Sequence, residues 1–300
     1  MQIPKVRLAD PGPEVSRIAA GCWRLVEWGW GEREVIAWVE ACLSHGITTF
    51  DHADIYGGYG AAALFGRALA NRPDLRDRLE VVTKCDIALV DPARPDHRVK
   101  HYDSSARHIR ATVDQQLTDL GVERIDVLLL HRPDPLMAAD EVAATFEQLR
   151  LAGKVAFFGV SNFTPANMDL LASRTHLVTN QVEHSLLHPE PLFDGTFDRC
   201  QQLRIRPMLW SPLGGGALFN SDDASAGRVR GALADMAPRY GVTAATLALA
   251  WLLREPAGPV PIMSSSRAAG VAEAAAACAV DLDRQDWFTL LAAATGAEVA

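Results

Sequence analysis

The chain has 300 residues, of which 49% are hydrophobic and 22% are charged, as is ordinary for a globular protein that buries a large core. Its formal net charge of −8 argues against a nucleic-acid partner, because proteins that bind nucleic acids usually carry a basic face. The five cysteines are spread without a C-x-x-C pair, and no uncharged run reaches the ~18 residues of a membrane span, so we expect a cytoplasmic protein with reduced thiols, no metal site and no membrane partner.

Short apolar runs alternate with longer amphipathic stretches along the chain, after a hairpin predicted around the turn ADPGPE. Eight candidate strands follow in the order RIAAGC, TTF, LEVVTK, IDVLLLH, VAFFGVS, VTNQV, RPMLW and GPVPIM. Between them, the segments 32–46, 104–121 and 140–154 have the apolar spacing of helices, and each includes a glycine suited to a helix C-terminus. Because the strands are apolar throughout rather than alternating, they predict a parallel sheet covered on both faces by helices.

Eight β/α units in this length predict one domain over residues 1–300, an α/β fold built as a closed (β/α)8 TIM barrel. We expect an N-terminal β-hairpin before the barrel and an extra helix at the C-terminal end of the chain. The loops 86–103 and 211–228 follow the third and seventh strands and should overhang the carboxyl ends of the strands. In barrels of this type that rim carries the chemistry.

Polar side chains stand where the predicted strands end. In chain order they are Asp51, Tyr56, Lys84, His131, Ser161, Asn162, Gln181 and Trp210, followed by the segment MSSSR after the last strand. A buried lysine beside a tyrosine favours the phenolate, and an aspartate beside that lysine keeps the lysine charged. Asp51, Tyr56 and Lys84 therefore predict a general-acid site for a carbonyl oxygen, and a histidine at the same rim can hydrogen-bond the phenol or the substrate. The amide and aromatic side chains of the set suit a nicotinamide.

Six motifs carry a resemblance to a known family: FDHADIYG, VVTKCDI, LLLHRPDP, FFGVSNFTP, NQVE and WSPLGGG. In their order and spacing, from about Gly21 to about Glu273, the chain resembles the aldo-keto reductase superfamily and its bacterial NADP-dependent oxidoreductases. The resemblance implies reduction of an aldehyde or ketone to an alcohol by hydride transfer, with NADP(H) as cofactor and NAD(H) as an open alternative. It also implies a catalytic tetrad of Asp51, Tyr56, Lys84 and His131. In that tetrad the tyrosine is the general acid, the lysine and the aspartate lower its pKa, and the histidine orients the substrate.

The same resemblance implies which residues hold the cofactor. Ser161, Asn162 and Gln181 match the residues that bind the carboxamide, and Trp210 stands where an aromatic ring stacks on the nicotinamide. The loop SPLGGG, which begins at Ser211, matches the loop that covers the pyrophosphate. The full implied set is Trp23, Asp51, Ser161, Asn162, Gln181, Trp210, Ser211, Leu213, Gly215, Ser265, Arg267 and Glu273.

The chain departs from the family's pattern near the adenine end of this implied site. Ala62 replaces a glutamate, and Ala274 replaces the usual asparagine. Gly270 stands where the family usually has an arginine that packs on the adenine or the 2′-phosphate. Arg267 could reach the 2′-phosphate instead, because a guanidinium matches the geometry of a phosphate.

Several alternatives stay open from the sequence. Asp51 and Lys84 also fit a purely structural ion pair, and Trp23 and Trp210 also fit simple packing. A short-chain dehydrogenase is excluded, because none of the four tyrosines has a lysine at the fourth position after it. The alternative function is a nucleotide-binding barrel that regulates or senses redox state with little turnover. The aromatic content of the rim loops favours a small apolar carbonyl compound as substrate, and the oligomeric state is open.

Overall fold

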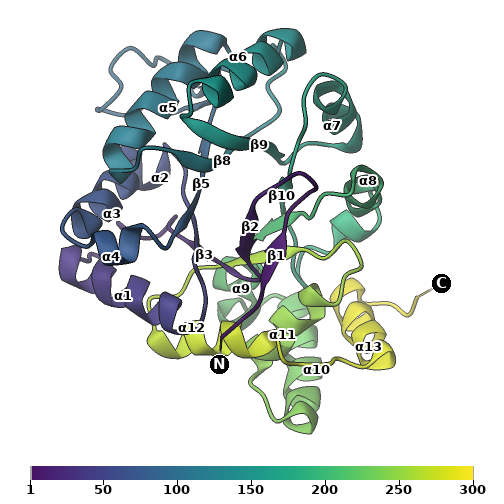
Figure 1. The fold of residues 1–300 in the computed structure, drawn as a ribbon. Coiled ribbons are helices and arrows are strands. Elements are labelled where there is room, and N and C mark those ends of the chain that lie inside the picture. The colour runs from purple at the N-terminus through teal and green to yellow at the C-terminus, as the bar shows by residue number, and fades with distance from the viewer. Residues whose placement is uncertain (1, 300) are drawn as a thin grey trace.

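Eight short parallel strands close into a barrel, and helices surround it (Figure 1). The computed structural model describes residues 2–299. In barrel order the strands are β10 (Asn180–Glu183), β11 (Met208–Trp210), β12 (Val260–Met263), β3 (Ala19–Gly21), β4 (Thr49–Asp51), β5 (Glu80–Cys85), β8 (Ile125–Leu130) and β9 (Val155–Ser161). Each strand coincides with a segment predicted from the sequence to within a residue or two, so the predicted (β/α)8 barrel is confirmed.

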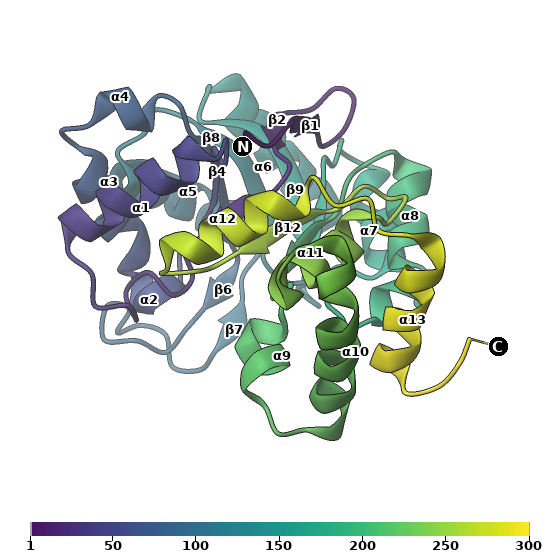
Figure 2. The same ribbon diagram turned by 90° about the horizontal axis from the view of Figure 1, so that it is seen from below.

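Helices cover the outside of the barrel (Figures 1 and 2). The longer ones are α1 (Glu32–Ser44), α3 (Ala61–Leu69), α5 (Ala106–Leu120), α6 (Ala139–Leu151), α7 (Pro165–Ala172), α8 (Thr196–Leu203), α10 (Ala224–Tyr240), α11 (Ala244–Leu253), α12 (Ala268–Ala277) and α13 (Arg284–Thr295). Local signals set their ends, as α5 illustrates. The Ser105 side chain accepts the backbone N–H of His108, and Gly121 ends the helix in the left-handed conformation at φ 65°.

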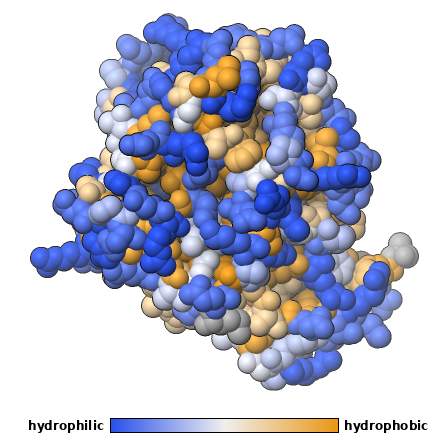
Figure 3. Space-filling view, viewed as in Figure 1, coloured by the Kyte–Doolittle hydropathy of each residue, from blue (hydrophilic) through white to orange (hydrophobic). Residues whose placement is uncertain are grey.

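The predicted N-terminal hairpin is confirmed as β1 (Lys5–Arg7) paired antiparallel with β2 (Glu14–Ser16). The backbone N–H of Ser16 donates to Thr49 Oγ1 at 2.9 Å, and the Ser16 hydroxyl accepts the N–H groups of Thr48 and Thr49. The hairpin therefore lies at the amino end of β4, away from the rim where the strands end. The surface on this side is mostly hydrophilic, with hydrophobic residues in small groups (Figure 3).

The predicted C-terminal helix is confirmed as α13, which packs beside α10 and α11 (Figure 2). The rings of Trp251 and Trp287 stack with centroids 5.1 Å apart and an interplanar angle of 9°. Each of the two indole N–H groups donates to the backbone carbonyl of the other tryptophan, at 3.0 and 3.1 Å. This reciprocal contact fixes the helix to the barrel's own α11.

The two long rim loops contain secondary structure that the sequence did not predict. In the first, β6 (Ile87–Ala88) pairs antiparallel with β7 (His101–Tyr102), and in the second lies the short helix α9 (Ala217–Asn220). Figure 2 shows both on the same side of the barrel as α2 (Tyr56–Tyr59). Within residues 2–299, no helix is long and apolar enough to cross a bilayer, and no group of three His, Cys, Asp or Glu residues could hold a metal ion.

Candidate active site

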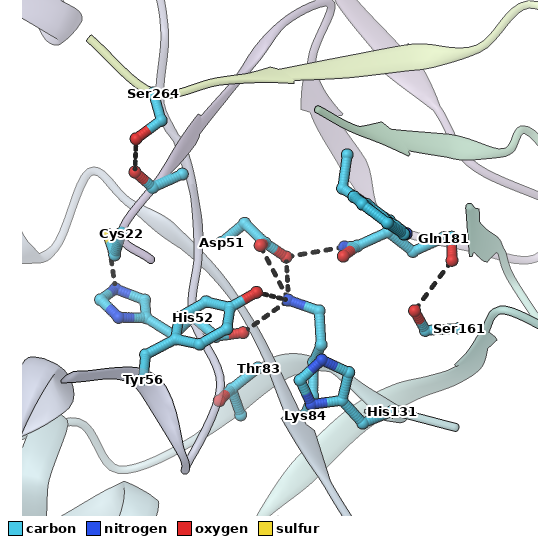
Figure 4. Close-up of polar contacts among 12 residues, drawn as sticks. Cys22, Asp51, His52, Tyr56, Thr83, Lys84, His131, Ser161, Gln181 and Ser264 are labelled. Atoms are coloured by element: carbon cyan, nitrogen blue, oxygen red, sulfur yellow. Dashed lines mark hydrogen bonds and ion pairs between the residues drawn. The ribbon is translucent and has the colours of Figure 1, made fainter. Parts of the chain in front are cut away.

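Lys84 is the centre of a buried polar network inside the barrel (Figure 4). Its Nζ donates to the two carboxylate oxygens of Asp51 at 2.9 and 2.8 Å, to the His52 carbonyl oxygen at 2.8 Å, and to the Tyr56 hydroxyl at 3.1 Å. The side chains of Lys84 and Asp51 are 1% and 4% exposed, and Asp51 also accepts Gln181 Nε2 at 2.7 Å. A charged pair this deeply buried requires that nearly every donor and acceptor is satisfied, and here it is.

The local sequence explains why these groups meet. β4 and β5 are parallel neighbours, with Asp51 in register with Val82, and Lys84 follows Val82 by two residues, so the side chains of Asp51 and Lys84 point to the same face of the sheet. After β4 the chain turns sharply at Gly57, where φ is 59° and an added Cβ would come within 2.5 Å of the Val26 side chain. Glycine is required there for both reasons, and the turn holds the Tyr56 hydroxyl over the lysine.

Electrostatics keep Tyr56 protonated. Burial raises the pKa of the phenol, the positive charge of Lys84 lowers it and the negative charge of Asp51 raises it, which leaves the pKa at about 12. The sequence predicted that Lys84 and Asp51 together lower this pKa. That prediction is wrong for Asp51, because its negative charge disfavours a phenolate. Lys84 does lower the pKa, but burial raises it by more. For Lys84, burial alone would lower the pKa, but Asp51 and Tyr56 raise it above its usual value, so the ammonium stays charged.

His131 follows β8 and faces the phenol. The ring centroids of His131 and Tyr56 are 6.1 Å apart at an interplanar angle of 78°. Burial and the positive charges of Lys84, Arg132 and Lys100 hold the pKa of His131 well below its usual value, so the imidazole is neutral at physiological pH. Its buried Nδ1 has no hydrogen-bond partner within residues 2–299. A neutral imidazole in this position can hydrogen-bond an uncharged oxygen next to the phenol.

A second hydrogen-bond network lies beside the first and joins Ser161, Asn162, Gln181 and Trp210. The Ser161 hydroxyl donates to the Gln181 carbonyl oxygen at 2.8 Å, and Asn162 Nδ2 donates to Ser161 Oγ at 2.8 Å. Trp210 Nε1 donates to Asn162 Oδ1 at 3.0 Å, which fixes the indole ring at the cavity wall. Asn162 adopts the left-handed conformation at φ 60°, which asparagine tolerates better than most residues. Because Gln181 also donates to Asp51, the two networks are continuous.

A cavity of about 980 Å³ connects Tyr56 and His131 with the distant Ser265 and Arg267. All of the cofactor-binding positions predicted from the sequence line it: Trp23, Asp51, Ser161, Asn162, Gln181, Trp210, Ser211, Leu213, Gly215, Ser265, Arg267 and Glu273. Lys84 does not line the cavity and reaches it only through Tyr56 and Asp51. The cavity is at the upper end of the volumes usual for ligand sites, so it can hold a large ligand.

The far end of the cavity fits an anionic group. The Arg267 side chain is 72% exposed, and its Nη2 lies 3.7 Å from Glu273 Oε2, a loose contact that leaves most of the guanidinium free. A Cβ added at Gly270 would come within 2.2 Å of Ser265 Oγ, so the serine occupies the space that a side chain at 270 would need. The glycine in place of the family's arginine is thereby explained, and Arg267 is the cation left at this end.

A segment of three glycines lies at the cavity, and two of them, Gly215 and Gly216, line it. Gly214, Gly215 and Gly216 all have positive φ, of 61°, 62° and 100°, which most other residues adopt only with strain. Arg24 Nη2 donates to the Gly215 carbonyl oxygen at 2.7 Å from the opposite loop. Because glycine has no side chain, the backbone at Gly215 and Gly216 can approach a ligand in the cavity closely.

Sequence reasoning missed several residues that line the site. Lys100, Tyr102, Arg132 and Arg24 all face the cavity. A signal existed for Arg132, which directly follows His131 in the motif LLLHRPDP. Lys100 lies in the loop 86–103 that was expected to overhang the rim, but only the folded loop with its ribbon β6–β7 determines which of its residues line the cavity.

The chain is similar to known proteins over nearly all of its length. The model of the aldo/keto reductase family matches residues 17–294. Oxidoreductase YdhF of Escherichia coli is 46% identical over 300 residues, covering 99% of this chain and 99% of the relative. A 6-dehydroglucose reductase of Agrobacterium fabrum is 45% identical over 290 residues, covering 96% and 97% of the two chains. The crystal structure of an aldo/keto reductase from Klebsiella pneumoniae in complex with NADP and acetate aligns with a TM-score of 0.78 at 26% identity, covering 95% of this chain and 94% of that one.

Proposed function

Because the chain belongs to the aldo/keto reductase family, we propose that it is an NADP(H)-dependent oxidoreductase that reduces an aldehyde or ketone carbonyl to an alcohol. One observation carries the proposal. A protonated Tyr56 is held 3.1 Å from a charged, fully buried Lys84, and the cavity that Tyr56 lines is also lined by the exposed Arg267, whose contact with Glu273 is loose at 3.7 Å. General-acid chemistry and a long anionic ligand are thereby accommodated in one site.

Tyr56 acts as the general acid. Its O–H bond breaks as the proton passes to the carbonyl oxygen, and the negative charge left on the phenolate is stabilised by Lys84. Asp51 keeps Lys84 ionised, and neutral His131 donates a hydrogen bond to the same carbonyl oxygen and so orients it. When bound, NADPH supplies the hydride that the carbonyl carbon takes up, so that the products are the alcohol and NADP⁺.

The residues present fit NADP(H). At one end Ser161, Asn162 and Gln181 would hold the carboxamide beside Trp210. At the other, Ser265 and Arg267 would hold the 2′-phosphate, since Arg267 has no tight acidic partner. The Klebsiella structure, which contains NADP, supports this choice over NAD(H).

We also propose that the substrate is a hydroxylated, sugar-like aldehyde in preference to an apolar carbonyl compound. The relative from Agrobacterium is named as a 6-dehydroglucose reductase and shares 45% identity with this chain. The cavity wall combines aromatic rings of Trp23 and Tyr102 with polar Asn220 and Arg132, a mixture suited to a substrate with hydroxyl groups.

We propose in addition that the protein acts in the cytoplasm, where thiols stay reduced, because none of the five cysteines is paired in a disulfide.

The test is NADPH and NADH oxidation by the purified protein with a panel of hydroxylated and apolar aldehydes. We expect turnover with NADPH, faster than with NADH, and a higher kcat/KM for the hydroxylated aldehydes. Tight binding of NADPH with negligible turnover of every carbonyl would instead favour a nucleotide-binding barrel that senses redox state. Higher kcat/KM for apolar aldehydes would overturn the substrate class and leave the reaction type intact.

A further inference from the structure

The charged side chains that line the cavity fall into two groups. Each acid has a basic partner, the pairs being Asp51 with Lys84 at 2.8 Å, Glu27 with Arg24 at 3.9 Å, and Glu273 with Arg267 at 3.7 Å. Lys100 and Arg132 also line the cavity, and neither has a carboxylate oxygen within 4.0 Å in the part of the chain that the structure describes. The cavity therefore carries two cations without counter-charges, although the chain as a whole has a net charge of −8.

Arg132 is held in place at the catalytic end. Its backbone N–H donates to both carboxylate oxygens of Asp86 at 3.3 Å, which fixes the main chain directly after His131. Its guanidinium lies over the ring of Trp210, 5.8 Å from the centroid, and so stays at the cavity wall. The Asp86 contact is made by the backbone, so the guanidinium keeps its hydrogen-bonding capacity for a ligand.

Lys100 comes from a different element and is an exposed residue of the loop 86–103. It lies one residue before β7, in the loop that overhangs the barrel, and lines the same cavity as Tyr56 and His131. The charges of both Arg132 and Lys100 contribute to the lowered pKa of His131, which places them within electrostatic reach of its imidazole. A ligand whose carbonyl meets Tyr56 and His131 would therefore extend toward both cations.

Both cations line the same cavity without a carboxylate partner, so an anionic group bound there would be attracted by two positive charges. A planar guanidinium binds carboxylate or phosphate oxygens with two parallel hydrogen bonds, and an ammonium adds a point charge. We propose that Lys100 and Arg132 bind an anionic group of the substrate, a carboxylate or a phosphate carried on the same carbon skeleton as the carbonyl. This inference rests on the proposed function and adds to it that the carbonyl substrate carries an anionic group.

The test compares matched aldehydes that differ only in an anionic group: succinic semialdehyde against butanal, D-glucuronate against D-glucose, and glyceraldehyde 3-phosphate against glyceraldehyde. For the wild type with NADPH we expect kcat/KM to favour the charged member by about tenfold or more, as one charge-assisted contact allows. The pair with the largest ratio distinguishes carboxylate from phosphate. Lys100→Met and Arg132→Met should each lower that ratio by about tenfold.

Arg98→Met is the matched control, because Arg98 is an exposed cation of the same loop that does not line the cavity. It should leave the ratio unchanged. Equal or lower kcat/KM for the charged members would overturn the inference, as would an equal fall of the ratio in Arg98→Met. If the wild type turns over no carbonyl at all, the proposed function fails instead. Calorimetric binding of 4-hydroxybutyrate, the alcohol product of succinic semialdehyde, then decides: binding that Lys100→Met weakens supports the inference, and no binding refutes it.

Discussion

Replacing Lys84 with methionine should destabilise the fold as well as abolish reduction. The substitution keeps the length of the side chain but removes the partner of Asp51, whose side chain is 4% exposed. Of the side-chain contacts described above, Asp51 would retain only the hydrogen bond from Gln181. Removing one partner of a buried ion pair leaves an uncompensated charge and costs about 3–5 kcal/mol. We expect the free energy of unfolding of Lys84→Met to fall by about that amount.

Urea denaturation followed by tryptophan fluorescence measures this change, since the chain has seven tryptophans. The double variant Asp51→Asn/Lys84→Met removes both charges and should recover at least about half of the loss, because no buried charge then remains. Lys154→Met is the control: Lys154 pairs with Asp114 at the surface, with side chains 41% and 57% exposed, so its loss should cost less than about 1 kcal/mol. Two results would refute a buried, charged pair of Asp51 and Lys84. One is a Lys84→Met variant as stable as Lys154→Met, and the other is a double variant no more stable than Lys84→Met.

Three further predictions concern the cofactor and the pH dependence. Arg267→Met should weaken NADPH binding by about tenfold and leave NADH binding nearly unchanged, as measured by quenching of tryptophan fluorescence. An equal loss of affinity for both nucleotides would exclude a contact between Arg267 and the 2′-phosphate. The rate of carbonyl reduction should be nearly constant between about pH 6 and 9, because the pKa of Tyr56 is about 12 and His131 is already neutral. A rate that falls with an apparent pKa near 8 would contradict a Tyr56 phenol that stays protonated over this range. Burial raises the pKa of Asp54 to about 7, so the wild type loses free energy of unfolding as the pH rises from about 4, the pKa in the unfolded chain, through 7. In urea denaturation, the free energy of unfolding of Asp54→Asn minus that of the wild type should therefore be larger at pH 8 than at pH 5. An equal difference at both pH values would show that Asp54 is not buried as a neutral acid.

The fold followed from the sequence because its signals are local and repeated. Eight apolar runs alternate with amphipathic segments, and glycines such as Gly121 end helices where they were expected to. The ribbon β6–β7 was missed because its strands have two residues each, too short for any period to show. Its pairing depends on contacts across the rim, which no local pattern encodes.

The candidate site followed from the sequence for a different reason. In a parallel barrel the ends of the strands must converge, so Asp51, Lys84 and His131 could be placed together before any distance was known. The sign of the pKa shift of Tyr56 could not be predicted, because burial, Lys84 and Asp51 act in different directions and their balance depends on distances. That Lys100 lines the cavity is likewise a property of the folded loop.

The most direct test of Tyr56 as general acid is the kcat for NADPH-dependent reduction by Tyr56→Phe, measured beside the Kd for NADPH. Phenylalanine preserves the ring and removes only the hydroxyl that lies 3.1 Å from Lys84. We expect kcat to fall by at least about a hundredfold, the usual contribution of a general acid, while the Kd for NADPH changes less than about twofold. A Tyr56→Phe variant that keeps more than about a tenth of the wild-type kcat would contradict the central role of the phenol.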